Sequence, residues 1–264
     1  MKNVLITGVA SGIGASVADI FAENGYNVYG IDVSEIHGDK GIVGYKADIT
    51  NEGALSAIAD HLRSSGISLD LIINVAGIHR MTSLVEGDYS KMKRLVDINL
   101  SGTMLVNRIF HSLLKDNGRI IIITSEVAGL DPMPFNGLYT LSKTALESYA
   151  QALRQELNLL GQRVITIRPG AIETPLSAAS MTDTARLAEN TQLYSAQAKR
   201  FSSLAAKFMG KPIKPQVISR IVYHAATTER PKPVYKKHHN LGLVLLNLLP
   251  LSWQCAIIKL LLNN

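Results

Sequence analysis

The sequence is poor in cysteine and in long uninterrupted hydrophobic runs. Cys255 is the only cysteine among 264 residues, so no disulfide bond can form within the chain. This favours a reducing compartment. Near the N-terminus, Gly8 interrupts the first apolar run too early for the hydrophobic region of a signal peptide. We therefore expect a cytoplasmic protein.

Acidic residues are fewer than basic ones, 21 against 27, which gives a formal net charge of +6. The basic residues are scattered through expected helices and the C-terminal segment. They do not form a stripe with interleaved aromatic side chains, the pattern typical of nucleic-acid binding. No nucleic-acid partner is predicted, because the phosphate of a small molecule would be a sufficient anionic partner for this charge. No metal site is predicted either.

Short β-branched runs alternate with amphipathic helical segments along most of the chain. Continuously apolar runs, such as residues 71–73 and 120–123, suit strands that helices cover on both faces. The pattern predicts an α/β fold, a Rossmann-like doubly wound parallel sheet in three αβα layers, within a single domain. The expected strands are residues 4–6, 27–31, 44–47, 69–74, 119–124 and 164–168, and the clearest helices are 12–24, 51–64 and 139–160.

The main domain is predicted to span residues 1–230. Within it, residues 174–212 are rich in Ala, Ser and Thr and show no strand pattern of their own. A helical segment that follows the core strands is a natural cover for a substrate site. The alternative is a helical hairpin that merely packs on the domain.

Residues 231–264 are predicted to form a basic, proline-rich connector and an apolar C-terminal tail. The apolar part is interrupted too often for a comfortable membrane span. We favour packing of the tail against the domain or a second subunit. The less favoured alternative is peripheral membrane contact, with Lys236 and Lys237 acting together with the apolar helix. The interrupting residues are Asn247, Pro250, Gln254 and Lys259.

A glycine-rich turn joins the first expected strand to the first expected helix. Its spacing, Gly-x-x-x-Gly-x-Gly, places glycines where a backbone can approach a pyrophosphate at a helix N-terminus. Any tight turn of this kind can use glycine, so the order strand, turn, helix carries the prediction. The predicted cofactor-binding residues of this turn are Gly8, Ser11, Gly12, Ile13 and Gly14.

Asp32 closes the second expected strand, eighteen positions after Gly14. A carboxylate at this place can accept hydrogen bonds from the adenosine ribose and repels an added 2′-phosphate. Neither Ser11 nor Val33 is an Arg or Lys that would attract that phosphate. We therefore predict NAD rather than NADP. The alternative is a solvated aspartate at a strand end.

Tyr139 and Lys143 lie four residues apart, so they share one face of a helix. An ammonium group beside a phenol favours the phenolate, and lowers the phenol pKa from about 10 toward working pH. An acid–base catalyst needs such a group. On its own, this pair would most often be a surface contact.

Six motifs together make residues 1–212 resemble the short-chain dehydrogenase/reductase family. The resemblance implies that Asp48 and Ile49 contact the adenine. It also implies that residues 169–174 hold the nicotinamide, with Thr174 and the Ile172 backbone near its carboxamide. The motifs are Thr7-Gly8-x-x-x-Gly12-Ile13-Gly14, Asp48-Ile49, Asn74-Val75-Ala76-Gly77, Asn99, Tyr139-x-x-x-Lys143 and Pro169-Gly170-x-x-x-Thr174.

The resemblance also implies roles beside the reacting centre. Asn74, Ala76 and Gly77 would stabilise the centre of the sheet next to the cofactor, with Asn74 a scaffold residue first and a contact second. The backbone of Asn99 would hold a water that leads from Lys143 to solvent, unless Asn99 is only a satisfied polar residue in a helix bend. Lys143 would also reach the nicotinamide ribose.

The sequence departs from the family pattern at one catalytic position. Similar enzymes carry a serine thirteen residues before the tyrosine and three before a glycine, where its hydroxyl donates to the substrate carbonyl. Counting back from Tyr139 and from Gly129 leads to Glu126, and Ser125 is one residue off.

Three interpretations follow. In the first, a local bulge brings Ser125 into the site and turns Glu126 away. In the second, an ionised Glu126 faces the substrate and favours an alcohol or amine donor; it could donate only if burial raised its pKa, which the charge of Lys143 would oppose. In the third, catalysis is weakened or lost and the protein only binds a cofactor.

The approach to Tyr139 is apolar and resembles the corresponding loop of steroid and retinol dehydrogenases in this family. We predict an NAD-dependent oxidoreductase that interconverts a hydrophobic secondary alcohol and a ketone, with Tyr139 as the acid and base. Similar enzymes assemble as homodimers or homotetramers, which we also expect. Ordinary core packing is the alternative role for the expected pocket residues, which are Met133, Phe135, Leu138, Met181, Leu187 and Leu193.

Overall fold

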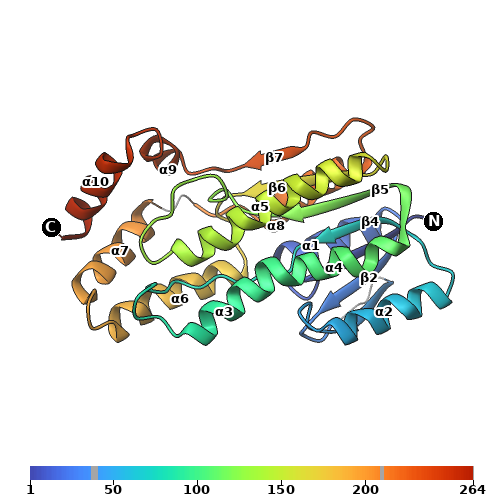
Figure 1. The fold of residues 1–264 in the computed structure, drawn as a ribbon, viewed down its shortest axis with the longest axis horizontal. Coiled ribbons are helices and arrows are strands. Elements are labelled where there is room, and N and C mark those ends of the chain that lie inside the picture. Colours follow the sequence, from blue (N-terminus) through green and yellow to red (C-terminus); the bar gives the residue numbers. More distant parts are fainter. Residues whose placement is uncertain (37–40, 209–210, 264) are drawn as a thin grey trace.

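The computed structural model describes residues 1–36, 41–208 and 211–263. Within these residues, seven strands form one parallel sheet in the order β3-β2-β1-β4-β5-β6-β7 (Figure 1). This confirms the predicted doubly wound α/β fold. The strands are β1 (Asn3–Thr7), β2 (Asn27–Asp32), β3 (Ile42–Lys46), β4 (Leu69–Asn74), β5 (Leu114–Ile123), β6 (Arg163–Pro169) and β7 (Val234–Lys237).

Helices cover both faces of the sheet, as the continuously apolar strands require. Side chains alternate across a strand, so Leu5 of β1 joins the core on one face while Val4 and Ile6 join the core on the other. One face packs on α2 (Glu52–Ser64), α4 (Thr103–Phe110) and α5 (Gly137–Asn158). The other packs on α1 (Gly12–Glu23) and α8 (Pro215–Thr227). The protein therefore has the three αβα layers that its sequence predicts.

Strand β7 lies in the segment where the sequence predicts only a connector. It pairs in parallel with β6, with Val234 opposite Thr166 and Lys237 opposite Pro169. Pro233 and the paired lysines argue against a central strand, but an edge strand tolerates both residue types, because one of its sides makes no ladder hydrogen bonds. The sheet thus continues beyond residue 230.

The carboxyl ends of the strands face a group of helices at one end of the molecule (Figure 1). Here α6 (Pro175–Asn190) and α7 (Ser195–Phe208) form a pair, and α10 (Leu251–Asn263) packs on α7. The short helix α9 (Leu241–Leu246) links β7 to α10. Of the helices in the described ranges, none is both long and apolar enough to cross a membrane.

Two further segments complete the path between β4 and β5. Helix α3 (Tyr89–Val96) runs into a π-helical turn at Asp97–Gly102, which leads directly into α4. A short 3₁₀ turn, His111–Leu113, then connects α4 to β5. The π-helical turn contains Asn99, and turns of this kind occur frequently at functional sites.

Candidate active site

The glycine-rich turn after β1 packs closely against the loop that follows β4. Gly8 has a φ of +76°, and a Cβ atom there would lie 2.8 Å from the Cα atom of Ala76. A Cβ atom at Gly14 would lie 1.8 Å from the carbonyl oxygen of Gly8. The hydroxyl of Thr7 accepts hydrogen bonds from the backbone N–H groups of Val75 and Ala76. Only glycine at positions 8 and 14 allows this compact corner.

The N-terminus of α1 opens toward the carboxyl edge of the sheet. Ser11 is its N-cap residue, and the Ser11 side chain makes no capping hydrogen bond within the described part of the chain. The first N–H groups of the helix are therefore available to an anion. Thr174, the N-cap of α6, lies nearby, because a Cβ atom at Gly12 would be 3.1 Å from Thr174 Cγ2. The Ile13 side chain instead packs against the core.

The carboxylate of Asp32 lies at the end of β2, beside the same turn. One of its oxygens accepts a hydrogen bond from Ala10 N at 3.0 Å, and the other accepts one from Ser34 N at 2.9 Å. Val33, the next residue, is 59% exposed. Each carboxylate oxygen can accept a further hydrogen bond, so Asp32 has the position and the chemistry to receive ribose hydroxyls.

Asp48 and Ile49, the expected adenine contacts, are both held by neighbouring residues. The Asp48 carboxylate accepts hydrogen bonds from Thr50 and Arg94. Partial burial raises the Asp48 pKa, but these hydrogen bonds outweigh it and lower the pKa below its usual value. Ile49 is buried and packs closely on Gly102. Their contact with adenine stays a prediction.

The loop after β4 joins the sheet to the helices around the expected active site. Asn74 Nδ2 donates to Asn107 Oδ1 at 2.8 Å, which ties β4 to α4 as a scaffold residue would. The Asn74 Oδ1 atom is buried and has no hydrogen-bond partner among the described residues. A Cβ atom at Gly77 would lie 3.1 Å from Asn99 Oδ1 and 3.5 Å from Lys143 Nζ. Gly77 therefore lies beside both expected catalytic groups.

Asn99 lies wholly inside the protein, in the π-helical turn. Its Nδ2 donates to the carbonyl of Ile78 at 2.9 Å and to Ser142 Oγ at 3.0 Å, and its Oδ1 accepts from Ile78 N at 2.8 Å. The Ser142 hydroxyl in turn donates to the carbonyl of Tyr139 at 2.8 Å. The Asn99 side chain thus links the loop after β4 to α5. The water relay through its backbone stays a prediction.

Tyr139 and Lys143 come together on the first turns of α5, as their spacing predicts. Lys143 Nζ lies 5.9 Å from the centre of the Tyr139 ring and donates to the carbonyl of Ile123 at 3.2 Å. Lys143 is 5% exposed, and burial lowers its pKa to about 8. Its ammonium form therefore loses its proton in a pH range where enzymes commonly work.

The predicted lowering of the Tyr139 pKa is wrong for this arrangement. Burial raises the pKa of Tyr139 to about 12, and the charge of Glu126 acts in the same direction. Only the hydrogen bond with Ser125 lowers it. The physical reason is burial: Tyr139 lies in a buried region that disfavours the charged phenolate, and the Lys143 ammonium, 5.9 Å from the ring centre, does not offset this.

Ser125 and Glu126 point in different directions from the end of β5. Ser125 is buried and makes the side-chain hydrogen bond to Tyr139. The Glu126 backbone donates to the carbonyl of Pro169 at 2.9 Å, and its carboxylate accepts from Asn240 N at 2.5 Å. Of the three interpretations of this position, the arrangement favours the one in which Ser125 faces the site and Glu126 turns away.

The charges around Glu126 differ from those expected. Burial raises the pKa of Glu126, while the bond from Asn240 and the charges of His239 and His238 lower it. Two histidines of the C-terminal segment, rather than Lys143, therefore oppose the rise of the Glu126 pKa. Gly170 packs against the same segment, since a Cβ atom there would lie 1.8 Å from the carbonyl oxygen of His238.

Residues 2–185 match the model of the short chain dehydrogenase family. The chain belongs to this family. An uncharacterized oxidoreductase of Staphylococcus saprophyticus is 31% identical to it over 188 residues, which cover 67% of this chain and 80% of the relative. A protein of Schizosaccharomyces pombe, named as an NADPH-dependent 1-acyldihydroxyacetone phosphate reductase, is 30% identical over 203 residues, 73% of this chain and 68% of its own.

Solved structures of a dehydrogenase and a reductase share the fold. The aldohexose dehydrogenase of Thermoplasma acidophilum, in ligand-free form, superposes with a TM-score of 0.76 at 20% identity, covering 91% of this chain and 94% of its own. The 3-ketoacyl-(acyl-carrier-protein) reductase of Brucella melitensis, in complex with NADH, gives 0.71 at 24% identity, with coverage of 89% and 96%. At these identities the likeness concerns the fold alone.

His79 is a neighbour of Tyr139 that sequence reasoning missed in this short-chain dehydrogenase. The two rings pack edge to face with centroids 4.2 Å apart, and His79 Nε2 lies 2.9 Å from Asn136 Oδ1. Burial, chiefly, lowers the His79 pKa to about 4, so the imidazole is neutral near pH 7. The sequence signal that could have identified His79 is its position two residues after Gly77, at the carboxyl edge of the sheet.

An apolar cluster lies between the loop before α5, the helix pair α6–α7 and the C-terminal helix. Of the expected pocket residues, Phe135, Met133 and Leu187 belong to it. Met181 and Leu193 do not: they are 54% and 66% exposed, since they lie on the outer side of the cover. Leu138 is buried outside this cluster. Helix α10 contributes Ile258 and Leu262, so the apolar tail packs against the domain, which is one of the two arrangements favoured from the sequence.

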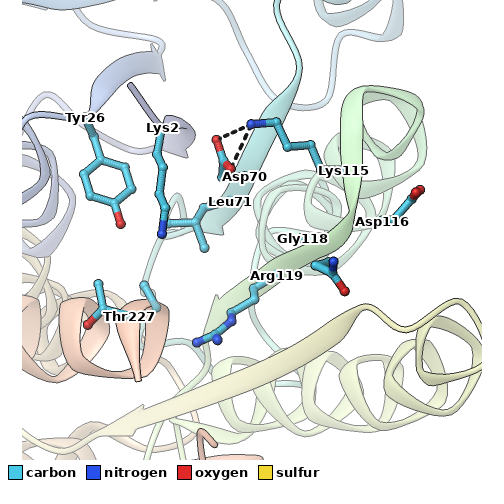
Figure 2. A pocket seen from close by; sticks show the side chains of 11 residues that line it. Lys2, Tyr26, Asp70, Leu71, Lys115, Asp116, Gly118, Arg119 and Thr227 are labelled. Atoms are coloured by element: carbon cyan, nitrogen blue, oxygen red, sulfur yellow. Dashed lines mark hydrogen bonds and ion pairs between the residues drawn. The ribbon is translucent and has the colours of Figure 1, made fainter. Parts of the chain in front are cut away.

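A cavity of about 470 Å³ opens at the opposite edge of the sheet (Figure 2). Its lining includes Lys2, Asp70, Lys115 and Arg119, near the amino ends of the strands. Lys115 Nζ donates to both carboxylate oxygens of Asp70, at 2.9 and 3.0 Å. Ser125 and Asn74 lie at the carboxyl ends, where open parallel sheets bind their ligands. This cavity is therefore separate from the candidate active site.

Proposed function

We propose that this short-chain dehydrogenase is an NAD(H)-dependent enzyme that interconverts a secondary alcohol and a ketone, with Tyr139 as acid and base. The observation that carries the proposal is the hydrogen bond between Ser125 and Tyr139, with Lys143 beside the same ring. These groups lie at the carboxyl edge of the sheet, next to the glycine-rich turn. Acid–base chemistry at an alcohol carbon needs this set of groups.

The residues present fit a nicotinamide dinucleotide. The uncapped N–H groups at the start of α1 suit a pyrophosphate, and the glycine corner leaves room for its close approach. The Asp32 carboxylate suits ribose hydroxyls. When bound, the nicotinamide supplies the hydride acceptor or donor of the reaction. Residues 169–174 and Lys143 would hold its nicotinamide half.

We assign the proton to Tyr139. In the reducing direction its phenol O–H donates to the carbonyl oxygen, and Ser125 donates a second hydrogen bond to the same oxygen. The phenolate that remains then lies beside Lys143. In the oxidising direction the phenolate takes the alcohol proton. Because the pKa of Tyr139 is about 12, protonated Tyr139 is the resting form and is ready to act as the acid.

The proposal of NAD over NADP depends on Asp32. One relative is named as NADPH-dependent and one solved neighbour holds NADH, so the comparisons alone do not decide. Asp32 is partly exposed at the end of β2, and its negative charge would repel a 2′-phosphate.

For the substrate we propose a hydrophobic alcohol or ketone, sterol-like or retinol-like in size and polarity. The support is the apolar cluster beside the loop that leads into Tyr139, with Phe135 packed edge to face against both Tyr194 and Phe201. Small-molecule recognition usually combines such a surface with a few polar groups.

The decisive experiment is a turnover screen of purified protein with NAD and with NADP, against sterols, retinoids, polyols and hydroxyacyl compounds. We expect nicotinamide reduction with an apolar secondary alcohol and NAD. Turnover of polyols only would contradict the substrate class, and turnover with NADP only would contradict the cofactor. The alternative of a catalytically weak protein depends on Glu126 in the place of the family serine. The Glu126 carboxylate instead accepts a hydrogen bond from Asn240 N, which weakens the support for that alternative.

We also propose a homodimer or homotetramer in a reducing, cytoplasmic setting. Leu141 of α5 and Met104 of α4 are 56% and 42% exposed, which supports an apolar contact on these helices. The exposed free thiol of Cys255 supports the compartment. Sedimentation equilibrium tests the assembly, and a strictly monomeric protein at micromolar concentration would contradict it.

A further inference from the structure

The C-terminal helices carry a row of exposed large apolar side chains. Leu241, Leu245 and Leu248 follow the spacing i, i+4 and i+7, so they share one side of α9 and its following turn. Trp253 and Leu260 share a side of α10 in the same way. We call these residues, together with Leu251 between the helices, the docking face. Their exposed fractions run from 61% to 76%: Leu241, Leu245, Leu248, Leu251, Trp253 and Leu260.

The opposite side of α10 is anchored, so the exposure of Trp253 and Leu260 is built into the fold. Gln254 is buried and donates to Asp131 Oδ2 at 2.9 Å and to the carbonyl of Leu249 at 3.0 Å. Arg200 of α7 donates to the carbonyl of Leu261 at 2.7 Å. Ile258 and Leu262 pack into the apolar cluster beside Phe135. With one side held in this way, the docking face points outward.

The charge around the docking face has one sign. Residues 230–264 contain five basic residues and no acidic residue, so this segment holds most of the chain's net charge of +6. Lys236 and Lys237 are exposed at the end of β7, just before α9. Lys259 is exposed on α10. The whole segment lies outside residues 2–185, which match the family model.

We propose that the docking face binds the surface of an anionic lipid bilayer. Exposed leucines, a tryptophan and flanking lysines are the combination by which helices lie in the headgroup region of such membranes. The like charge of the segment disfavours the rival occupant, a second copy of the chain. A two-fold contact would bring two basic segments together with no acidic residue in either to offset them.

Membrane docking would place the bilayer next to the proposed substrate site. Helix α10 has the docking face on one side, while its other side contributes Ile258 and Leu262 to the cluster that includes Phe135. An apolar substrate dissolved in the bilayer would then be separated from this cluster by a single layer of helix. Docking itself does not depend on the proposed oxidoreductase activity.

Trp253 is the only tryptophan of the chain, so its fluorescence reports directly on the docking face. The test mixes the full-length protein with vesicles of phosphatidylserine and phosphatidylcholine, and separately with vesicles of phosphatidylcholine alone. We expect a blue shift of the emission and protection from acrylamide quenching with the anionic vesicles, weaker at high salt. Absence of any shift at saturating anionic vesicles would overturn the proposal.

Two double variants separate the apolar and the electrostatic contributions. Leu245→Ser with Leu248→Ser should lower vesicle partitioning about tenfold or more, because two leucine side chains no longer enter the apolar part of the membrane. Lys236→Gln with Lys237→Gln should lower it about fivefold per lysine, with anionic vesicles only. The matched control is Leu159→Ser with Leu160→Ser at the end of α5, where Leu159 and Leu160 are also exposed, and it should partition like the original protein.

Circular dichroism before and after heating verifies that each variant folds. Equal partitioning of the Leu245 and Leu248 variant and of the original protein would overturn the proposal. So would a blue shift that grows with protein concentration in the absence of vesicles and disappears in that variant, because the docking face would then bind a second copy.

Discussion

The carboxylate of Glu126 accepts a hydrogen bond from the backbone N–H of Asn240 at 2.5 Å, across 114 positions of the sequence. Glu126 therefore fastens the chain at the point where it leaves β7 and enters α9. The neighbouring Ser125 side chain turns the other way, toward Tyr139. The carboxylate at the position where similar enzymes carry a serine is thus explained by a structural contact to the C-terminal segment.

Substitutions at these two neighbours should have opposite effects. Ser125→Ala removes a hydrogen-bond donor to the substrate oxygen, so kcat should fall by roughly 10²–10³-fold. Glu126→Gln keeps an acceptor for Asn240 N, and most of the turnover should remain. Steady-state kinetics of both variants measure the contrast. If Glu126→Gln is inactive and Ser125→Ala is fully active, our placement of the serine is wrong.

Glu126→Ala should instead affect stability. It leaves the Asn240 N–H without its acceptor, which costs about 1–3 kcal/mol in the free energy of unfolding. Chemical denaturation of this variant beside Glu126→Gln gives the difference. An unchanged denaturation midpoint in Glu126→Ala would show that the contact does not hold the segment.

Tyr139→Phe should lower turnover by roughly 10²–10⁴-fold, because the proton then has no acid or base to move it. NAD affinity should change little, since the phenol acts on the substrate. Calorimetric titration with NAD measures the binding, and the same sample measures the rate. A variant with near-normal turnover would remove Tyr139 from the mechanism.

The free energy of unfolding should decrease as the pH falls, because His79 must take up a proton on unfolding. Its pKa in the folded protein is about 4, against 6.5 in the unfolded chain, so between these values the unfolded state binds more protons. The contribution of His79 to stability is complete above pH 6.5 and is lost as the pH falls toward 4, by up to about 3 kcal/mol. In His79→Phe this part of the pH dependence should disappear, as urea denaturation at several pH values would reveal. Parallel pH profiles for the two proteins would contradict the assignment.

Asp32→Ala should weaken selectivity between the two cofactors. Removing the carboxylate takes away hydrogen bonds to the ribose and the repulsion of a 2′-phosphate, so NAD binds more weakly and NADP more tightly. We expect the ratio of kcat/KM values to move toward NADP by at least about tenfold, equivalent to about 1.4 kcal/mol. Asp19→Ala on α1 is a control that should keep the original ratio. An unchanged ratio in Asp32→Ala would place the selectivity elsewhere.

The layered sheet and the cofactor corner could be predicted from the sequence because both depend on local patterns. Runs such as residues 120–123 are apolar on both faces, so only a covered strand can hold them. Gly8 and Gly14 follow a strand and begin a helix, which is the order that a phosphate-binding corner needs. Tyr139 and Lys143 share a face of α5 through helical spacing alone.

Other features depend on contacts between distant parts of the chain. β7 becomes a strand only because the edge of β6 offers it hydrogen bonds, since its own lysines and the proline just before it do not predict a strand. The pKa of Tyr139 is raised because burial outweighs the hydrogen bond with Ser125, and burial is a property of the packed protein.

By itself the sequence determined the family, the fold and the pair Tyr139 and Lys143, because turn chemistry and periodicity are local. The tertiary structure alone decided that Ser125 faces Tyr139 and that Glu126 does not. A shift of one residue at a strand end is small in the sequence, but it directs the two side chains to different partners. The partner of Glu126 is Asn240, and only folding brings those two residues together.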